Sequence, residues 1–190
     1  MTEQDRIRAF VALEMPSSIR EIIRREQRAM KAELPGARWT RPEGQHLTLR
    51  FLGEAPRDRL RALTEEISTS IAGMPAITVR LSGAGFFPSP KRPRVAWVGG
   101  RADGGAELAA AVDAAAVAAG FPAERRSWSL HLTQARLDRP WPRRAVEAYL
   151  EWGRGLEFEP FTCREVVLFS SRLGPGGAVY TPLERFPLAC

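Results

Sequence analysis

The sequence predicts an α+β fold built from two similar lobes. Two observations predict it. The order strand, helix, strand, helix, strands is followed along the 190 residues by helix, strand, helix, strands, which is an approximate duplication of the layout. The tripeptide His-Leu-Thr also occurs twice, at 46–48 and 131–133, and it contains the only two histidines of the chain. We expect residues 1–190 to form a single bilobal domain, with a boundary between the repeats from Gly99 to Gly105 and one His-Leu-Thr strand in each lobe.

In the first repeat, alternating apolar residues predict strands, and apolar residues three or four apart predict helices. Ser17 or Ser18 can cap the first helix. Proline and glycine residues predict a loop at 35–45, and prolines stiffen a second loop at 88–93. The predicted strands are 6–13, 46–53, 76–87 and 94–100, and the predicted helices are 18–34 and 57–71.

The second repeat begins with an alanine-rich stretch that has an acidic first turn and a closing glycine, which is typical of a helix. A later helix has Pro142 in its first turn and Gly153 past its end. A glycine-rich turn at 174–177 separates the last two strands. The predicted helices are 104–120 and 141–155, and the predicted strands are 127–137, 161–173 and 178–188.

Charge and composition limit the function classes. The net charge of +6 and the pI near 10.3 favour an anionic partner. No apolar run approaches the roughly 20 residues that span a bilayer, and the first residues lack the layout of a signal peptide. The two cysteines, Cys163 and Cys190, do not form a disulfide framework. We therefore expect a cytoplasmic protein that does not enter a membrane.

Strand parity decides which side chains accompany each histidine. Side chains two apart on a strand share a face, so His46, Thr48 and Arg50 are expected on one face. The core-facing residues of this strand are then Leu47, Leu49 and Phe51.

In the second copy, His131 and Thr133 share a face. Strict alternation puts Arg136 on the opposite face, so Arg136 reaches His131 only through a bulge or around the strand end.

Two histidines with two hydroxyls suit displacement at a phosphodiester. One neutral imidazole can take a proton from the attacking oxygen, and one charged imidazole can protonate the leaving oxygen. Hydroxyls can donate hydrogen bonds to the anionic oxygens, and no metal is required. The alternatives are two structural histidines in strands or a zinc site, and two distant histidines without a CxxC pair do not resemble a zinc ligand set.

The segments "RPEGQHLTLRFLGE" and "HLTQAR" resemble the paired HxTx signatures of the 2H phosphoesterase superfamily. The similarity is to its 2′-5′ RNA ligase-like branch, also described as RNA 2′,3′-cyclic phosphodiesterases, and it spans nearly the whole chain. It implies two pseudo-two-fold-related lobes, with antiparallel sheets flanked by helices and an active-site cleft between them. It also implies metal-independent hydrolysis of a terminal 2′,3′-cyclic phosphate on RNA to a 2′-phosphate, and in some members reversible 2′-5′ joining of RNA.

Carried over by residue, the resemblance implies that His131 is the base and His46 the acid, while Thr48 and Thr133 bind the phosphoryl oxygens. Arg136 matches an arginine that binds phosphate. Arg50 stands where relatives often have lysine, and is expected to bind substrate as well. No cofactor and no metal are implied.

Two residues depart from the family pattern. Leu130 stands where relatives commonly have proline, and Gln134 replaces an apolar residue and points toward the predicted core. A buried amide without hydrogen-bond partners would cost about 1–3 kcal/mol.

Three functions stay open at the level of sequence. The first is the RNA-end phosphodiesterase, acting as a monomer on RNA with cyclic phosphate ends, of which tRNA halves are one candidate. The second is the same chemistry on a small cyclic nucleotide or an ADP-ribose derivative. The third is a non-catalytic RNA-binding protein. The segment 88–94 carries Lys91, Arg92 and Arg94 beside Phe86 and Phe87. These residues could bind the rest of an RNA chain, and the alternative is a solvated loop over a core phenylalanine.

Overall fold

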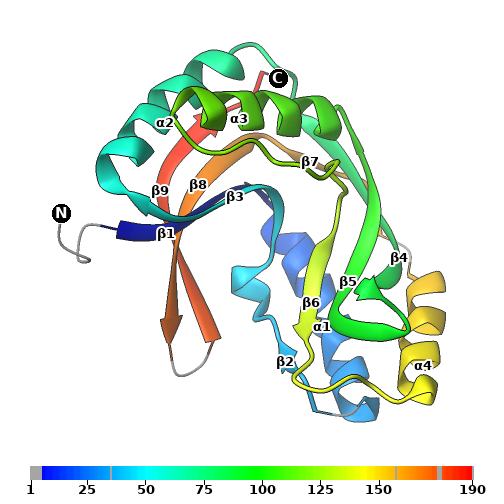
Figure 1. Cartoon of the computed structure of the whole chain (residues 1–190). Coiled ribbons are helices and arrows are strands. Elements are labelled where there is room, and N and C mark those ends of the chain that lie inside the picture. The colour runs from blue at the N-terminus through cyan, green and yellow to red at the C-terminus, as the bar shows by residue number, and fades with distance from the viewer. Residues whose placement is uncertain (1–5, 35, 157, 175–176, 190) are drawn as a thin grey trace.

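A computed structural model describes residues 6–34, 36–156, 158–174 and 177–189. Within these residues the chain forms two antiparallel sheets with helices beside them, so the predicted α+β fold is confirmed (Figure 1). The first sheet has the order β3 (His46–Pro56), β1 (Arg6–Glu14), β8 (Glu165–Gly174), β9 (Gly177–Pro187). The second sheet has the order β2 (Arg38–Trp39), β6 (Leu132–Arg136), β5 (Arg92–Asp103), β4 (Ile77–Ser89), β7 (Phe161–Cys163).

Each sheet contains strands from both ends of the chain, so the expected boundary at Gly99 to Gly105 is wrong. The C-terminal strands β8 and β9 return to pair with β1 in the first sheet. Strands β4 and β5, from the first repeat, form the second sheet with β6. The predicted turn at 174–177 lies partly outside the described residues.

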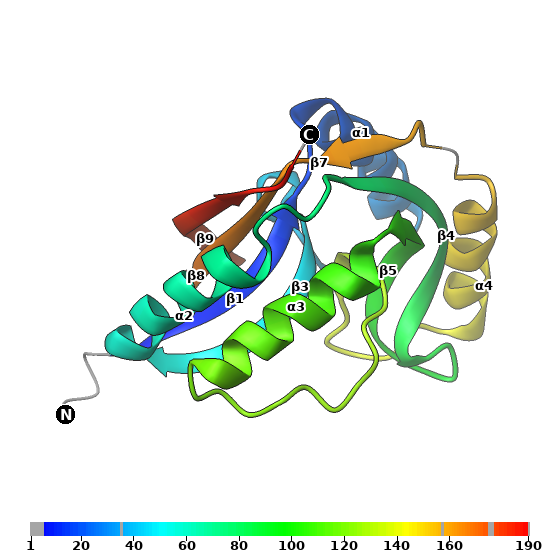
Figure 2. The same cartoon turned by 90° about the horizontal axis from the view of Figure 1, so that it is seen from above.

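The helices also cross between the repeats. Helix α3 (Gly105–Ala118) follows β5 of the second sheet but packs with α2 (Arg57–Ser70) beside the first sheet, as Figure 2 shows from above. Helix α1 (Ser17–Glu33) follows β1 of the first sheet, but its last turns pack Met30 and Leu34 against the second sheet with α4 (Arg143–Arg154). Neither serine caps α1, because Pro16 is the N-cap residue and no side chain bonds the cap. The two sheets are therefore held together by exchanged helices.

The main core spans both sheets. Leu13 and Leu47 of the first sheet belong to the same buried cluster as Val79, Val98 and Leu132 of the second sheet. A second cluster fills the space between the second sheet, α1 and α4. Burial of apolar surface contributes about 25 cal/mol per Å², so this shared cluster stabilises both sheets together.

Several element ends differ from the predicted ones. The proline-rich segment 88–93 is not a long loop, since β4 and β5 extend into it as a tight hairpin. The predicted strand 127–137 is regular only from Leu132 to Arg136, so His131 lies just before β6. Gly153 lies inside α4, not past its end.

Gly153 is required by close packing of α4 on β4. A Cβ added to Gly153 would lie 2.2 Å from the Cβ of Ala84 and 2.7 Å from its backbone nitrogen. Because backbone cannot yield as a flexible side chain does, we expect Gly153→Ala to lower the free energy of unfolding by about 1–3 kcal/mol. Urea denaturation measures this, with Gly155→Ala as the control, since the nearest atom to a Cβ there is 3.6 Å away. Equal stability of the two variants would contradict the prediction.

Candidate active site

The two His-Leu-Thr segments have the same burial pattern over six residues. From His46 to Phe51 and from His131 to Arg136, burial runs half-buried, buried, half-buried, buried, buried, exposed. By position in the two segments, Phe51 corresponds to Arg136 and Arg50 corresponds to Ala135. The fifth and sixth residues break strict alternation in both copies, which indicates a shared backbone irregularity.

In β3 the irregularity is a bulge at Leu49. Thr48 pairs with Ala12 of β1, but Arg50 pairs with the adjacent Val11, which leaves Leu49 without a partner. After the bulge the faces exchange. The side chain of Arg50 is 7% exposed and turns to α3, while Phe51 is 51% exposed and stands on the face of His46. The parity-based predictions for Arg50 and Phe51 are therefore wrong, and those for Leu47 and Leu49 are confirmed.

In β6 the same bulge falls at Gln134. Thr133 pairs with Trp97 of β5 and Ala135 pairs with the adjacent Ala96, so Gln134 is the unpaired residue. The bulge turns Arg136 to the face of Thr133. Of the two routes that the sequence analysis allowed for Arg136, the structure therefore shows the bulge.

The two strands meet at a cavity of ≈ 280 Å³. Four of the predicted site residues line it: His46, Thr48, Thr133 and Arg136. His131 lies beside the cavity, near enough to His46 for its charge to lower the pKa of that residue. Arg50 is not brought to the cavity, because its side chain points to the opposite face of β3. Residues that the sequence analysis did not single out as site residues also line it, namely Arg8, Phe10, Thr40, Phe51 and Tyr180.

Each histidine ring is fixed by the carbonyl two residues before it. Nδ1 of His46 lies 2.8 Å from the Gly44 oxygen, and Nδ1 of His131 lies 2.9 Å from the Ser129 oxygen. A carbonyl can only accept, so Nδ1 carries the hydrogen in both rings. The Nε2 atoms are left for proton transfer, and the two histidines have the same tautomer.

Aromatic residues surround both rings. Phe10 stacks on His46 at 4.4 Å between ring centroids, and Tyr180 meets it edge-on at 5.0 Å. Phe87 meets His131 edge-on at 5.0 Å. These contacts hold the rings and remove water from one side of each.

Burial lowers the pKa of His46 to about 4, because the charged ring loses hydration. The hydrogen bond to Gly44 opposes this change, while the positive charges of His131 and Arg136 lower the pKa further. His46 is therefore neutral near pH 7.

The buried amide of Gln134 has partners. Its Oε1 accepts from Nε2 of Gln27 at 3.1 Å and from Nε2 of Gln45 at 3.5 Å. Gln27 also donates to the Thr40 carbonyl at 3.2 Å. Gln45 precedes His46 and Gln134 follows Thr133, so this amide cluster joins the two histidine segments beneath the cavity. The departure of Gln134 from the apolar pattern is therefore compensated by hydrogen bonds.

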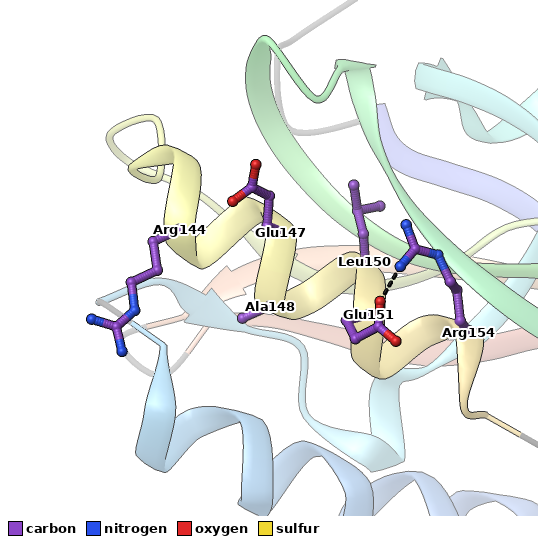
Figure 3. A pocket seen from close by; sticks show the side chains of 6 residues that line it. All are labelled: Arg144, Glu147, Ala148, Leu150, Glu151 and Arg154. Carbon is purple, nitrogen blue, oxygen red and sulfur yellow. Dashed lines mark hydrogen bonds and ion pairs between the residues drawn. The ribbon is translucent and has the colours of Figure 1, made fainter.

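A larger hollow of ≈ 430 Å³ lies along α4, away from both histidines (Figure 3). The six residues that line it all come from one helix, and their side chains do not converge. Glu151 and Arg154 pair with each other there. The charged side chains of this hollow lie on the surface of one helix and do not point toward a common ligand position, so it is not a candidate site.

Two further observations concern metals and membranes. Among the described residues, no group of three or more His, Cys, Asp and Glu side chains could hold a metal ion. No helix in the described ranges is long and apolar enough to cross a membrane. Cys163 is a free, buried thiol whose pKa burial raises to about 12, and Cys190 lies outside the described residues.

The bilobal fold, with two His-Leu-Thr segments that share a burial pattern and a bulge and meet at one cavity, defines a phosphoesterase of the two-histidine (2H) class. The profile of the family described as "LigT like Phosphoesterase" matches residues 13–97 and 101–180. The chain belongs to this family and is an enzyme of the phosphoesterase type.

Relatives and solved structures agree with this membership. The chain is 29% identical to the RNA 2′,3′-cyclic phosphodiesterase of Methanothermobacter thermautotrophicus, over 96% of this chain and 100% of the relative. It is 31% identical to the protein of the same name from Archaeoglobus fulgidus, over 95% and 99%. The fold is similar to a crystal structure of a Thermus thermophilus protein, with a TM-score of 0.79 and 29% identity over 96% and 98%. It is also similar to E. coli LigT complexed with 3′-AMP, with a TM-score of 0.74 and 26% identity over 97% and 99%.

Proposed function

We propose that this enzyme hydrolyses the terminal 2′,3′-cyclic phosphate of RNA to a 2′-phosphate by acid-base catalysis with His46 and His131. The observation that carries the proposal is the shared geometry of the two histidines, which have the same tautomer. His46 lines the cavity with Thr48 and Thr133, and His131 lies beside it, near enough for its charge to lower the pKa of His46. The relatives named RNA 2′,3′-cyclic phosphodiesterase support the choice of substrate.

In this reaction water attacks phosphorus and the bond to the 3′ oxygen breaks. One histidine takes the proton of the water, and the other donates a proton to the departing 3′ oxygen. The hydroxyls of Thr48 and Thr133 and the guanidinium of Arg136 line the cavity and hold the non-bridging oxygens. Such donors act most strongly where charge develops, and each is typically worth about 2.7–4 kcal/mol. If the 5′ hydroxyl of a second RNA replaces water as the nucleophile, the same displacement forms a 2′-5′ linkage as the bond to the 3′ oxygen breaks, and we propose this ligation as a second reaction of the site.

We assign His46 as the base. A base must be unprotonated, and burial keeps the pKa of His46 near 4. His131 then supplies the proton to the leaving oxygen. This assignment is the reverse of the one that the family resemblance implies.

The acid–base assignment predicts the pH dependence of a variant without the acid. In His131→Ala the residual kcat/KM depends on the base alone, and the loss of the His131 charge moves the pKa of His46 upward from about 4. We expect kcat/KM to rise with pH and to level off by about pH 6.5, the ordinary histidine value. Initial rates from pH 4.5 to 9 measure this. A residual rate that falls as pH rises over the acid range would assign His46 as the acid.

RNA is favoured over a small cyclic nucleotide by the β4–β5 hairpin. Phe87 is 37% exposed beside His131, and the nearby tip carries exposed Lys91, Arg92 and Arg94. No described carboxylate forms an ion pair with these three cations. Exposed aromatic residues stack on the bases of single-stranded RNA, and exposed basic residues contact its phosphates.

The experiment that tests the function compares two substrates in EDTA. A short RNA with a 2′,3′-cyclic phosphate end and the matching cyclic mononucleotide are incubated with the wild-type enzyme, and the product phosphate is located. Turnover of the RNA to a 2′-phosphate, with a KM that rises with salt, is expected. Turnover of the mononucleotide alone would favour the small-substrate alternative, and RNA binding without turnover would favour the non-catalytic one.

The two lobes are proposed to act as one domain of a monomer. The shared core cluster, with Leu47 from one sheet and Leu132 from the other, supports a single cooperative unit. The cavity contains residues of both sheets of the same chain and needs no partner subunit.

A further inference from the structure

Arg50 lies behind the active-site strand, where its buried guanidinium meets two partly exposed carboxylates. Its Nε pairs with Asp113 of α3 at 2.7 Å, and its Nη1 pairs with Glu124 at 3.5 Å. It also donates to the carbonyl of Phe51 at 3.0 Å and to the carbonyl of Pro122. One guanidinium thus holds its own strand, helix α3 and the segment that follows α3.

That segment, residues 121–131, leads directly to His131 and contains no helix or strand. No sheet pairing fixes it. Core packing of Phe121 and Leu130 holds its two ends, and side-chain hydrogen bonds hold the residues between them. Asp113 accepts from the backbone N–H of Glu124 at 3.1 Å. The indole of Trp128 donates to the carbonyl of Thr48 at 2.8 Å. Arg50 and Thr48 both belong to β3, so the strand of His46 holds the segment that ends in His131.

We propose that Arg50 is a positioning residue that sets the place of His131 relative to His46. The inference rests on the proposed function, in which the two imidazoles act on one phosphate. The tie at Pro122 and Glu124 fixes the start of the segment, and the tie from Trp128 to Thr48 fixes its end. Proton transfer requires atoms placed within fractions of an ångström, and a misplacement of 1 Å can cost about 10²-fold in rate.

The contacts of Arg50 require an arginine and not only a positive charge. Arg50 reaches two carboxylates and two carbonyls in different directions. A planar fork with five donors can do this, whereas the ammonium of lysine is a point charge with three donors. Arg50→Lys should therefore keep the charge balance of Asp113 and Glu124 but lose the hold on the segment.

The test combines kinetics with the NMR signals of the two histidine rings. In Arg50→Met and Arg50→Lys we expect kcat on the cyclic-phosphate RNA to fall about 10- to 100-fold, with KM changed by less than about threefold. The ring signals of His131 should shift or broaden more than those of His46. Trp128→Phe removes the tie to Thr48 alone, and keeps the test usable where an Arg50 variant fails to fold; it should lower kcat with the same NMR signature.

The matched control is Arg185→Met. Arg185 also bridges two carboxylates, Glu14 and Glu165, but it ties strands of the first sheet and does not touch residues 121–131. This variant should keep kcat and both ring signals.

Unchanged kcat in folded Arg50→Met, full activity of Arg50→Lys, or a loss of kcat with an unmoved His131 ring would overturn the inference. If the wild type turned over no cyclic phosphate, the proposed function would fail, while the ring signals would still decide whether Arg50 positions His131.

Discussion

Replacing either histidine by alanine is expected to lower kcat about 10²- to 10⁴-fold. On the proposed assignment, His46→Ala removes the base and His131→Ala removes the acid, so each variant keeps only one of the two groups that transfer protons. The measurement is hydrolysis of a short RNA with a 2′,3′-cyclic phosphate end, in EDTA. Because the two groups act in one step, the double variant should lose much less than the product of the two single losses.

The control for this experiment is Thr78→Ala, a strand residue of β4 outside the cavity. It should keep its activity, and thermal unfolding should show that both histidine variants are folded. A single variant that retains the wild-type rate would remove that histidine from the mechanism and would leave its ring as part of the aromatic packing with Phe10 or Phe87.

Arg136→Met is expected to lower kcat/KM about 10²- to 10³-fold, the effect typical of removing one donor to a developing oxyanion. A second, independent result is expected without substrate. The charge of Arg136 lowers the pKa of His46, so its removal should raise that pKa above its value of about 4. An NMR titration of the His46 ring measures this.

Arg101→Met is the matched control for Arg136→Met. Arg101 is an exposed arginine of β5 in the same sheet, and it does not line the cavity. It should change neither kcat/KM nor the titration of His46. A loss of activity in Arg136→Met with an unmoved titration would indicate that Arg136 does not face His46.

The sequence correctly predicted the parts of the site that depend on the alternation of neighbouring residues along one strand. Alternation correctly set Leu47 and Leu49 in the core and left His46 and Thr48 on the other face. The fold class followed from the repeated order of elements, since apolar periodicity is a local property of each segment.

The features that the sequence did not predict depend on contacts between segments that are distant along the chain. A bulge arises from the register of one strand against its neighbour, and β3 alone does not reveal that it lies beside β1. This is why Phe51 and Arg50 exchanged faces. Phe10 and Tyr180 were missed for the same reason, because they reach His46 from β1 and β9. The exchange of α1 and α3 between sheets likewise requires knowledge of the packed core.

The twin bulges bear on how a ligand is oriented. A site made of two equivalent strands would offer a symmetric ligand two equal ways to bind, related by a half-turn. The sixth position of each motif breaks this equivalence, because it is the aromatic Phe51 in one strand and the cationic Arg136 in the other. A base is attracted to the first and a phosphate to the second. On the proposed function, we therefore expect this pair of side chains to let a nucleotide bind in one direction only, so that each histidine acts at one end of the reaction.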